Sequence, residues 1–267
     1  MPDRVWYRTH QAIGTMALNT AERVSREVTD NFVYQRSRLA YFEAAKRVEG
    51  RVLEIGTGTG YGIEIIAPHA ERYVTLDKHC AVDVVSLPAN VEFREAKVPP
   101  LPFADGEFDC VVSFQVIEHI VRDKEFVAEV MRVLRKGGKF IVSTPNKPMS
   151  LTRNPWHVRE YRAEEFKALL SGFSSVEYYG VGGNEQVWAY YEKNRESVHR
   201  IMRFDVLRMQ WWLPRWILQL PYDVANRLNR RRLHSQNRVL TESIKMDDYA
   251  LQEVDDRCFD LFYVAIK

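Results

Sequence analysis

Two kinds of segment alternate along most of the chain. Short apolar runs typical of buried strands are separated by stretches with apolar residues at helical spacing. We expect strands at residues 51–56, 72–77, 90–96, 108–114, 139–145, 174–182 and 258–267. We expect helices at residues 34–48, 61–70, 123–138 and 163–173. This alternation predicts the α/β class: a Rossmann-like, doubly wound, seven-stranded and mostly parallel sheet with helices on both faces.

One long segment breaks the alternation. Residues 184–245 hold no clear strand pattern and carry four of the six tryptophans. We expect a helical insertion that folds onto the same domain just before the last strand. The expected organisation is an N-terminal helical arm (1–50), a cofactor-binding core (51–183), the helical insertion or lid (184–245) and a final part that returns to the sheet (246–267).

Composition sets broad limits on the class of protein. With 267 residues, 46% of them hydrophobic, the chain can bury the core of one large α/β domain. Its net charge of +2 gives no reason to expect a nucleic-acid partner. The three cysteines are far apart and form no CxxC pair, which fits a cytoplasmic location. We see neither an apolar signal segment nor a membrane-spanning run, and nothing that indicates the oligomeric state.

A glycine-rich stretch follows the first strand and precedes a helix. It reads VLEIGTGTGYG, and its first three glycines are Gly56, Gly58 and Gly60. A dinucleotide fingerprint would need a third glycine at position 61 or 63, where Tyr61 and Ile63 stand. The G-K-[ST] ending of a phosphate-binding P-loop is also missing. The remaining pattern is an acid, Glu54, followed by three glycines at every second position.

This pattern resembles the first motif of class I S-adenosylmethionine-dependent methyltransferases. The carboxylate of that cofactor can accept hydrogen bonds from backbone N–H groups near a helix N-terminus. Its ammonium group needs an acid, and Glu54 can serve directly or through water. The resemblance implies that Gly56, Thr57, Gly58 and Gly60 lie against the cofactor.

Two further stretches carry the same resemblance. SFQVIEHI (113–120) is closely similar to a run in ubiquinone-pathway O-methyltransferases, and VLRKGGKFIVSTPN (133–146) matches the family's helix, glycine turn and fifth strand. The resemblance covers residues 50–182 and the last strand, which it implies to be antiparallel. It also implies that Phe114 and Gln115 face the methionine end of the cofactor.

Acidic residues after the second and third strands are candidates for binding the adenosine. Asp77 ends the second strand, where a carboxylate can accept both ribose hydroxyls, and Lys78 follows it. NAD enzymes also place an acid there, so the glycine spacing is what separates the two cofactors. Many methyltransferases have Gly-Asp-Ala after the third strand, and Glu95 and Ala96 are the nearest match in this chain.

Two histidines are the candidate catalytic residues. A neutral acceptor must lose a proton during methylation, and histidine titrates in a suitable range. His119 follows the fourth strand and His157 follows the fifth. Beside His157, the side chains expected to contact the acceptor are Trp156, Arg159 and Tyr161. We expect no metal, because no constellation of metal ligands is visible in the sequence.

The insertion has an unusual charge balance. Residues 187–240 contain 11 Lys and Arg but 4 Asp and Glu, together with aromatic residues. One interpretation is a lid that makes peripheral contact with a membrane surface. The interpretation that we favour at this stage is a helical cap whose tryptophans complete the core and whose arginines are solvated.

The N-terminal arm loosely resembles a segment found in methyltransferases associated with cell-surface polysaccharide, and Tyr34, Arg38 and Tyr41 would close over the cofactor. We therefore expect methyl transfer to a small molecule, glycan or glycolipid, on oxygen. The alternatives are an NAD-type oxidoreductase and an S-adenosylmethionine-binding protein without catalysis.

Overall fold

The computed structural model describes residues 26–205 and 209–267. Residues 1–25 of the expected N-terminal arm therefore lie outside the described part of the chain, and so do positions 206–208, which include Arg208.

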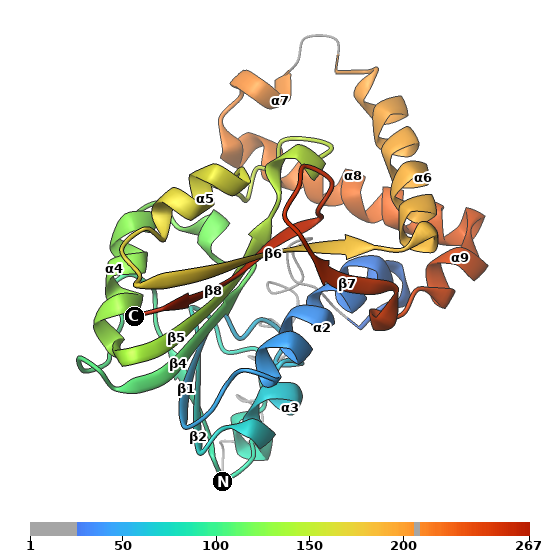
Figure 1. Cartoon of the computed structure of the whole chain (residues 1–267). Helices are drawn as coiled ribbons and strands as arrows, with labels where there is room; N and C mark the ends of the chain where they lie inside the picture. Colours follow the sequence, from blue (N-terminus) through green and yellow to red (C-terminus); the bar gives the residue numbers. More distant parts are fainter. Residues whose placement is uncertain (1–25, 206–208) are drawn as a thin grey trace, which may run out of the picture.

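A mixed sheet of eight strands, in the order β3-β2-β1-β4-β5-β8-β6-β7, runs through the molecule (Figure 1). Strands β3, β2, β1, β4 and β5 are mutually parallel, whereas β8 pairs antiparallel with both β5 and β6. The strands are β1 (Arg51–Ile55), β2 (Arg72–Asp77), β3 (Val91–Glu95), β4 (Phe108–Phe114), β5 (Leu134–Pro145), β6 (Ser175–Gly183), β7 (Tyr249–Gln252) and β8 (Asp260–Ile266). The expected class, the mostly parallel sheet and the antiparallel last strand are confirmed.

The sheet has one strand more than the sequence predicts. Strand β7 pairs antiparallel with the edge strand β6. Its four residues, YALQ, lie between acidic residues and are too short to show a clear alternation of apolar and polar positions.

Helices cover both faces of the sheet (Figure 1). Helices α2 and α3 belong to one apolar core, which continues into the insertion, and α4 and α5 belong to a second core on the opposite face. The α-helices are α2 (Asn31–Ala45), α3 (Ile63–Ile66), α4 (Asp123–Val133), α5 (Ala163–Leu169), α6 (Glu185–Met202), α7 (Met209–Trp212), α8 (Arg215–Gln236) and α9 (Arg238–Ser243).

The helix expected at residues 61–70 is much shorter than predicted. It consists of the single turn α3 and a 3-10 turn at Ala67–His69. Pro68 lacks the N–H group that a continuing α-helix would need, which explains the early end. At its start, Gly62 packs under the ring of Tyr41, where an added Cβ would lie 2.0 Å from a ring carbon.

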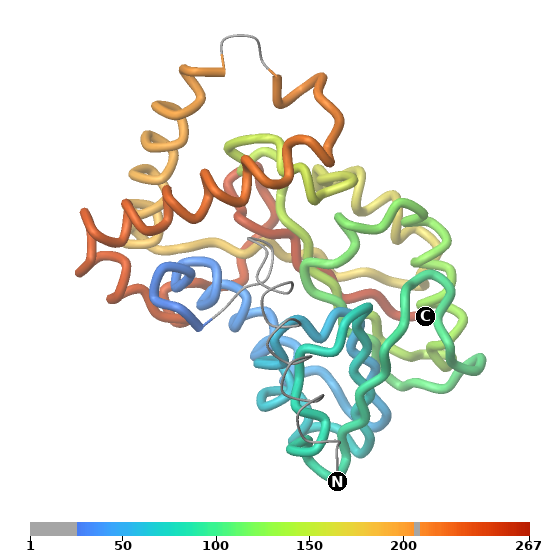
Figure 2. The backbone as a smooth tube through the Cα atoms, turned by 180° about the vertical axis from the view of Figure 1, so that it is seen from behind, coloured from blue at the N-terminus to red at the C-terminus, as the bar shows by residue number. Residues whose placement is uncertain are grey.

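The insertion is helical and returns to α2. Figure 2 shows α8 and α9 beside the N-terminal α2, and the Asn31 side chain donates to the carbonyl groups of Thr241 and Ile244. Trp188 packs on Phe259. The expectation that the tryptophans complete the core is wrong for Trp211, Trp212 and Trp216, which are 62–73% exposed. Among the described residues, no helix is long and apolar enough to cross a membrane.

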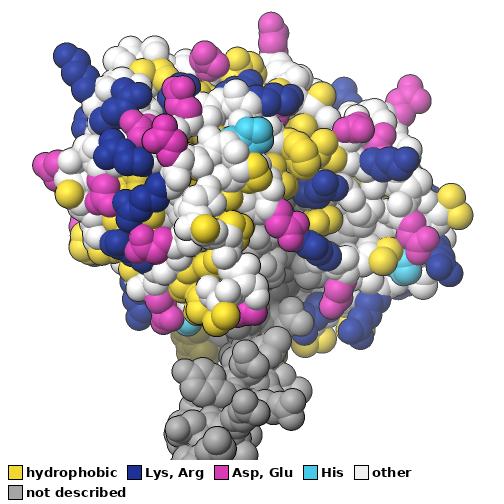
Figure 3. All heavy atoms as spheres, turned by 90° about the horizontal axis from the view of Figure 1, so that it is seen from below, with side chains coloured by type: hydrophobic (Ala, Val, Ile, Leu, Met, Phe, Trp, Pro, Cys, Tyr) yellow, Lys and Arg dark blue, Asp and Glu magenta, His cyan; other side chains and the backbone are white. Residues whose placement is uncertain are grey.

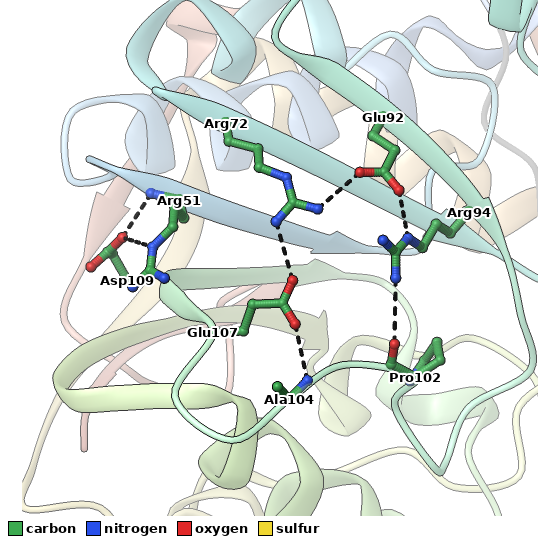
Figure 4. Close-up of polar contacts among 8 residues, drawn as sticks. All are labelled: Arg51, Arg72, Glu92, Arg94, Pro102, Ala104, Glu107 and Asp109. Atoms are coloured by element: carbon green, nitrogen blue, oxygen red, sulfur yellow. Dashed lines mark hydrogen bonds and ion pairs between the residues drawn. The ribbon is translucent and has the colours of Figure 1, made fainter.

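Ion pairs join the starts of the parallel strands. Seen from below, the molecule shows Lys and Arg interspersed with Asp and Glu (Figure 3). In the close-up of Figure 4, Arg72 at the start of β2 bridges Glu92 and Glu107, and Arg51 at the start of β1 pairs with Asp109 at 3.0 Å. Burial raises the pKa of Asp109, but hydrogen bonds from Arg51 and Arg135 outweigh it and lower that pKa to about 2.

Replacing Asp109 should reduce stability in a pH-dependent way. A carboxyl whose pKa is lowered on folding stabilises the fold above its unfolded pKa of about 4 and loses that contribution as the pH falls towards 2. We expect Asp109→Asn to lower the free energy of unfolding by about 1–2 kcal/mol at pH 7. Urea unfolding between pH 2 and 7 measures this, and an equal loss at every pH would contradict the assignment.

Candidate active site

A cavity of about 570 Å³ lies at the carboxyl ends of β1, β2 and β4. We call it the glycine-loop cavity. In an open parallel sheet this edge is where ligands bind, because loops on both sides of the strand ends leave a crevice. Its walls come from the glycine loop, from α2, from the segments after β2, β3 and β4, and from the first residue of β8. Of the predicted cofactor residues, the cavity is lined by Gly56, Thr57, Gly58, Asp77, Lys78, Ala96, Phe114 and Gln115.

The glycine loop has a backbone that side chains would disturb. Gly56, Gly58 and Gly60 all have positive φ angles, of 97°, 56° and 81°. A Cβ on Gly56 would lie 2.4 Å from Val116 Cγ2. Gly58 lines the cavity, and a Cβ there would point into open space. The loop therefore presents bare backbone to whatever occupies the cavity.

Asp77 stands beside this loop, at the end of β2. Its two carboxylate oxygens accept hydrogen bonds from the backbone N–H groups of Gly58 and His79, at 3.0 and 3.1 Å. Glu95 is the other acid predicted here. Its side chain is exposed, and the residue does not line the cavity. Its contact with adenine stays a prediction.

Glu54 is buried behind the cavity. Its carboxylate accepts hydrogen bonds from the hydroxyl groups of Tyr41, at 2.7 Å, and Thr75. Burial is the main cause that raises the pKa of Glu54, and these hydrogen bonds oppose the shift. Tyr41 lines the cavity and Glu54 does not, so the contact between Glu54 and a ligand ammonium group, directly or through water, stays a prediction.

The backbone changes direction sharply after β4. Gln115 has a φ angle of 56°, a left-handed conformation that is uncommon for residues other than glycine. Its backbone N–H donates to the carbonyl of Ser143 on β5 at 3.0 Å. Strain of this kind gathers at functional sites, and Gln115, Phe114 and Ser143 all line the glycine-loop cavity.

A second cavity, of about 540 Å³, lies between α2, the segment 145–160 and the insertion helices. We call it the insertion cavity. Aromatic and amide side chains face it: Phe32, Tyr190, Tyr191, Phe204, Tyr222, Phe259, Asn146, Asn154, Asn194, Asn226 and Asn229. Its arginines are already engaged, since Arg153 donates to the carbonyl of Gln210 and Arg230 pairs with Asp30.

Three elements contribute to both cavities. Helix α2 turns residues 32, 33 and 36 to the insertion cavity and residues 37, 40 and 41 to the glycine-loop cavity. In the segment after β5, Pro155 and His157 line the insertion cavity and Trp156 between them lines the other. At β8, Phe259 and Asp260 divide in the same way. The two cavities therefore lie on either side of these shared elements, which we call the wall.

A buried ion pair lies in this wall. Arg36 Nε is 2.9 Å from Asp260 Oδ2. Arg36 lines the insertion cavity, and Asp260, which is 3% exposed, lines the glycine-loop cavity. Within the described residues, Asp260 Oδ1 and Arg36 Nε are both buried without a hydrogen-bond partner, so the contact between the two side chains is an ion pair without hydrogen-bond geometry. Burial raises the pKa of Asp260, and Arg36 and then Gln115 oppose that shift.

The two predicted catalytic histidines also meet at this wall. Their rings are 5.0 Å apart in an edge-to-face arrangement, with His119 on the side of the glycine-loop cavity and His157 on the side of the insertion cavity. His157 Nδ1 lies 2.8 Å from Glu160 Oε1, and its Nε2 lies 2.9 Å from the Asn154 amide nitrogen. His119 Nδ1 lies 3.1 Å from the carbonyl oxygen of Trp156.

Two of the predicted acceptor residues turn elsewhere. Arg159 pairs with Asp123, and the Tyr161 hydroxyl donates to the same carboxylate at 2.9 Å. Neither residue is among those that line the two cavities, so their contact with an acceptor stays a prediction. Trp156 does line the glycine-loop cavity, and its indole N–H donates to Asp223 of α8 at 3.0 Å.

The sequence indicates no metal site, but the structure brings together one group of possible ligands. The potential ligand atoms of Glu118, His119 and His157 lie within 4.8 Å of one another. Glu118 also accepts a hydrogen bond from Thr144 at 3.1 Å. A metal at His157 Nε2 would have to displace its contact with Asn154.

Sequence reasoning missed Arg36 and Asp260. Asp260 does leave a signal, because it is a charged residue within the apolar run CFDLFYVAI at the expected last strand. Arg36 leaves none, since an arginine on an amphipathic helix usually faces water.

The chain is similar to known methyltransferases. The methyltransferase domain family matches residues 53–142. A probable S-adenosylmethionine-dependent methyltransferase of Mycolicibacterium smegmatis is 40% identical over 248 residues, which cover 89% of this chain and 90% of that protein. A protein of the same description from Mycobacterium tuberculosis is 39% identical over 168 residues, covering 59% of this chain and 61% of that one.

A solved structure shares the fold. The S-adenosylmethionine-dependent methyltransferase of Thermotoga maritima, described as a possible histamine N-methyltransferase, has a TM-score of 0.54 and 15% identity, over 88% of this chain and 92% of that one. Together with the extended identity to the mycolicibacterial protein, these matches show that the chain belongs to the S-adenosylmethionine-dependent methyltransferases.

Proposed function

We propose that the enzyme methylates an oxygen atom of a neutral, hydroxyl-rich acceptor, such as a glycan or the sugar of a glycolipid, held in the insertion cavity. The observation that carries this proposal is that α2, the segment after β5 and the start of β8 line both cavities. Methyl transfer needs donor and acceptor held close together and in line, and shared elements position both cavities at once.

The glycine-loop cavity fits the cofactor. Bare backbone at Gly58 leaves room for a ligand to lie against the chain, and Asp77 offers a carboxylate suited to a ribose diol. Tyr41 closes the cavity from α2 and couples it to the buried carboxylate of Glu54. When bound, S-adenosylmethionine supplies an activated methyl group.

The side chains of the insertion cavity support the class of acceptor. The Asn226 amide can donate hydrogen bonds to hydroxyl groups and accept them, whereas the amides of Asn146, Asn154, Asn194 and Asn229 already take part in hydrogen bonds within the protein. Aromatic rings offer apolar faces that pack against a sugar ring. The three arginines Arg36, Arg153 and Arg230 are engaged with protein groups. This pattern favours a neutral acceptor over an anionic one.

We further propose that Asp260 accepts the proton of the acceptor hydroxyl. With the cofactor bound, the hydroxyl oxygen of an acceptor that reaches the wall would form the O–CH₃ bond as the S–CH₃ bond breaks, which leaves S-adenosylhomocysteine. The hydroxyl proton would pass to Asp260 Oδ1, the oxygen that is not paired with Arg36. A carboxylate with a raised pKa in a buried position is a better proton acceptor than an exposed one. The prediction that His157 or His119 fills this role instead stays open to the same experiment.

Changing the glycine loop and Asp77 should weaken cofactor binding. Gly58→Val fills the open space beside the loop, and Asp77→Ala removes the carboxylate, so each should reduce the affinity for S-adenosylhomocysteine about tenfold or more. Isothermal titration measures the affinity. Glu71→Ala, an exposed acid outside the cavity, is the control. Unchanged affinity in both loop variants would contradict this placement of the cofactor.

Asp260→Asn should lower the rate of methyl transfer by a factor of about 10²–10⁴. The assay follows radiolabelled methyl transfer from S-adenosylmethionine to fractions of a cell extract, and then to the purified acceptor. In the wild type the rate should fall as the pH drops through the raised pKa of Asp260, because the protonated carboxyl accepts no proton. This acid limb should vanish in Asp260→Asn.

Substitution of Arg36 provides a second test, because the direction in which the pH dependence should move is known. Because Arg36 lowers the pKa of Asp260, Arg36→Met should move the acid limb to higher pH, and Arg36→Lys should largely restore its position. The variants His119→Asn and His157→Asn should keep the acid limb. If either histidine variant abolishes it while Asp260→Asn keeps it, the proton acceptor is that histidine.

A further inference from the structure

Exposed large apolar side chains are concentrated in the insertion. We call this group the tryptophan ridge, and its residues are each 50–86% exposed: Phe204, Trp211, Trp212, Trp216, Leu220, Val224 and Leu228. Helix α7 and the start of α8 project at the top of the molecule in Figure 1. Single exposed apolar side chains need no explanation, but a concentration of large ones on one part of the molecule indicates an interaction site.

The spacing along α8 makes the ridge directional. Trp216, Leu220, Val224 and Leu228 are four residues apart, so they follow one side of the helix. The opposite side faces the protein and includes the buried residues Asn229 and Leu233. Helix α8 therefore has two distinct faces. One packs against the protein, and the other, which carries the apolar row, is exposed to solvent.

Positive charge continues the same face. Arg227 and Arg231 are exposed and, at 3.6 residues per turn, point to the same side of α8 as the apolar row. Helix α8 contains five arginines and one acid, Asp223, which binds the Trp156 indole. Tryptophans thus lie at the N-terminal end of this face of α8, and arginines lie towards its C-terminal end.

The ridge borders the mouth of the insertion cavity. Ile201, Phe204 and Met209 line that cavity and are also 40–86% exposed. A molecule anchored at the ridge would therefore sit beside the cavity entrance.

We propose that the tryptophan ridge docks the enzyme on the surface of an anionic lipid bilayer. Tryptophan is enriched at the boundary between lipid and water, because its ring is apolar and its N–H still finds a polar partner. Each arginine close to an anionic leaflet adds electrostatic attraction, which salt weakens. A second copy of the chain fits this face less well, since it would bring another strongly basic insertion against the first.

Vesicle co-sedimentation tests this docking directly. The full chain should sediment with vesicles of phosphatidylcholine and phosphatidylglycerol, and much less with phosphatidylcholine alone. Replacing Trp211, Trp212 and Trp216 together by alanine should lower binding about tenfold or more, because the apolar contact is lost. Arg227→Gln combined with Arg231→Gln should weaken binding to anionic vesicles and reduce its sensitivity to salt.

The matched control is a variant with Val85→Ser and Val121→Ser, two exposed apolar residues away from the insertion. It should bind vesicles as the wild type does, and thermal unfolding should confirm that all variants are folded.

The proposal is overturned if the wild type does not bind anionic vesicles or if the triple tryptophan variant binds equally well. It is also overturned if the ridge proves to hold a second copy, seen as a dimer that the tryptophan variant dissociates. Vesicle binding needs neither acceptor nor methyl transfer, so its failure and failure of the proposed function are distinguishable.

Discussion

The ion pair between Arg36 and Asp260 ties together the parts of the molecule on which the proposed function depends. It joins α2 to the first residue of β8 at the wall between the two cavities. A buried ion pair costs desolvation energy that its own attraction often fails to offset. Its position at the wall therefore fits a role in chemistry better than a role in stability. The second carboxylate oxygen of Asp260, which is buried without a hydrogen-bond partner among the described residues, supports the same conclusion.

Most of the fold could be predicted from the sequence, because buried parallel strands are nearly continuous apolar runs and glycines mark their ends. Strand β7 was not predicted, because four residues at a sheet edge are too few to show an alternation of apolar and polar positions. The helix after the glycine loop was overestimated because Pro68 and the contact of Gly62 with Tyr41 limit it to one turn. The first difference arises from a strand too short to show a pattern, and the second from a proline within the helix together with a contact between segments distant in sequence.

The site residues also divide into those that could be predicted from the sequence and those that could not. The strand–glycine–helix order placed the glycine loop, Asp77 and Lys78 at one edge of the sheet, and the family resemblance added Gln115; these residues line the same cavity. The sequence alone could not place side chains that depend on α2 or on the insertion. Arg159 and Tyr161 turn to Asp123, and Glu54 is enclosed by hydroxyl groups. The exposure of the insertion tryptophans also became visible only once the helices were arranged in space.

A crystal structure with S-adenosylhomocysteine would test the central claim most directly, since it fixes where the reacting centre lies. The account predicts that the ribose hydroxyls bind Asp77 and that the sulfur atom faces the wall at Asp260, with the insertion cavity directly beyond it. A sulfur atom that points away from Asp260 and from the insertion cavity would contradict both the acceptor site and the role of Asp260.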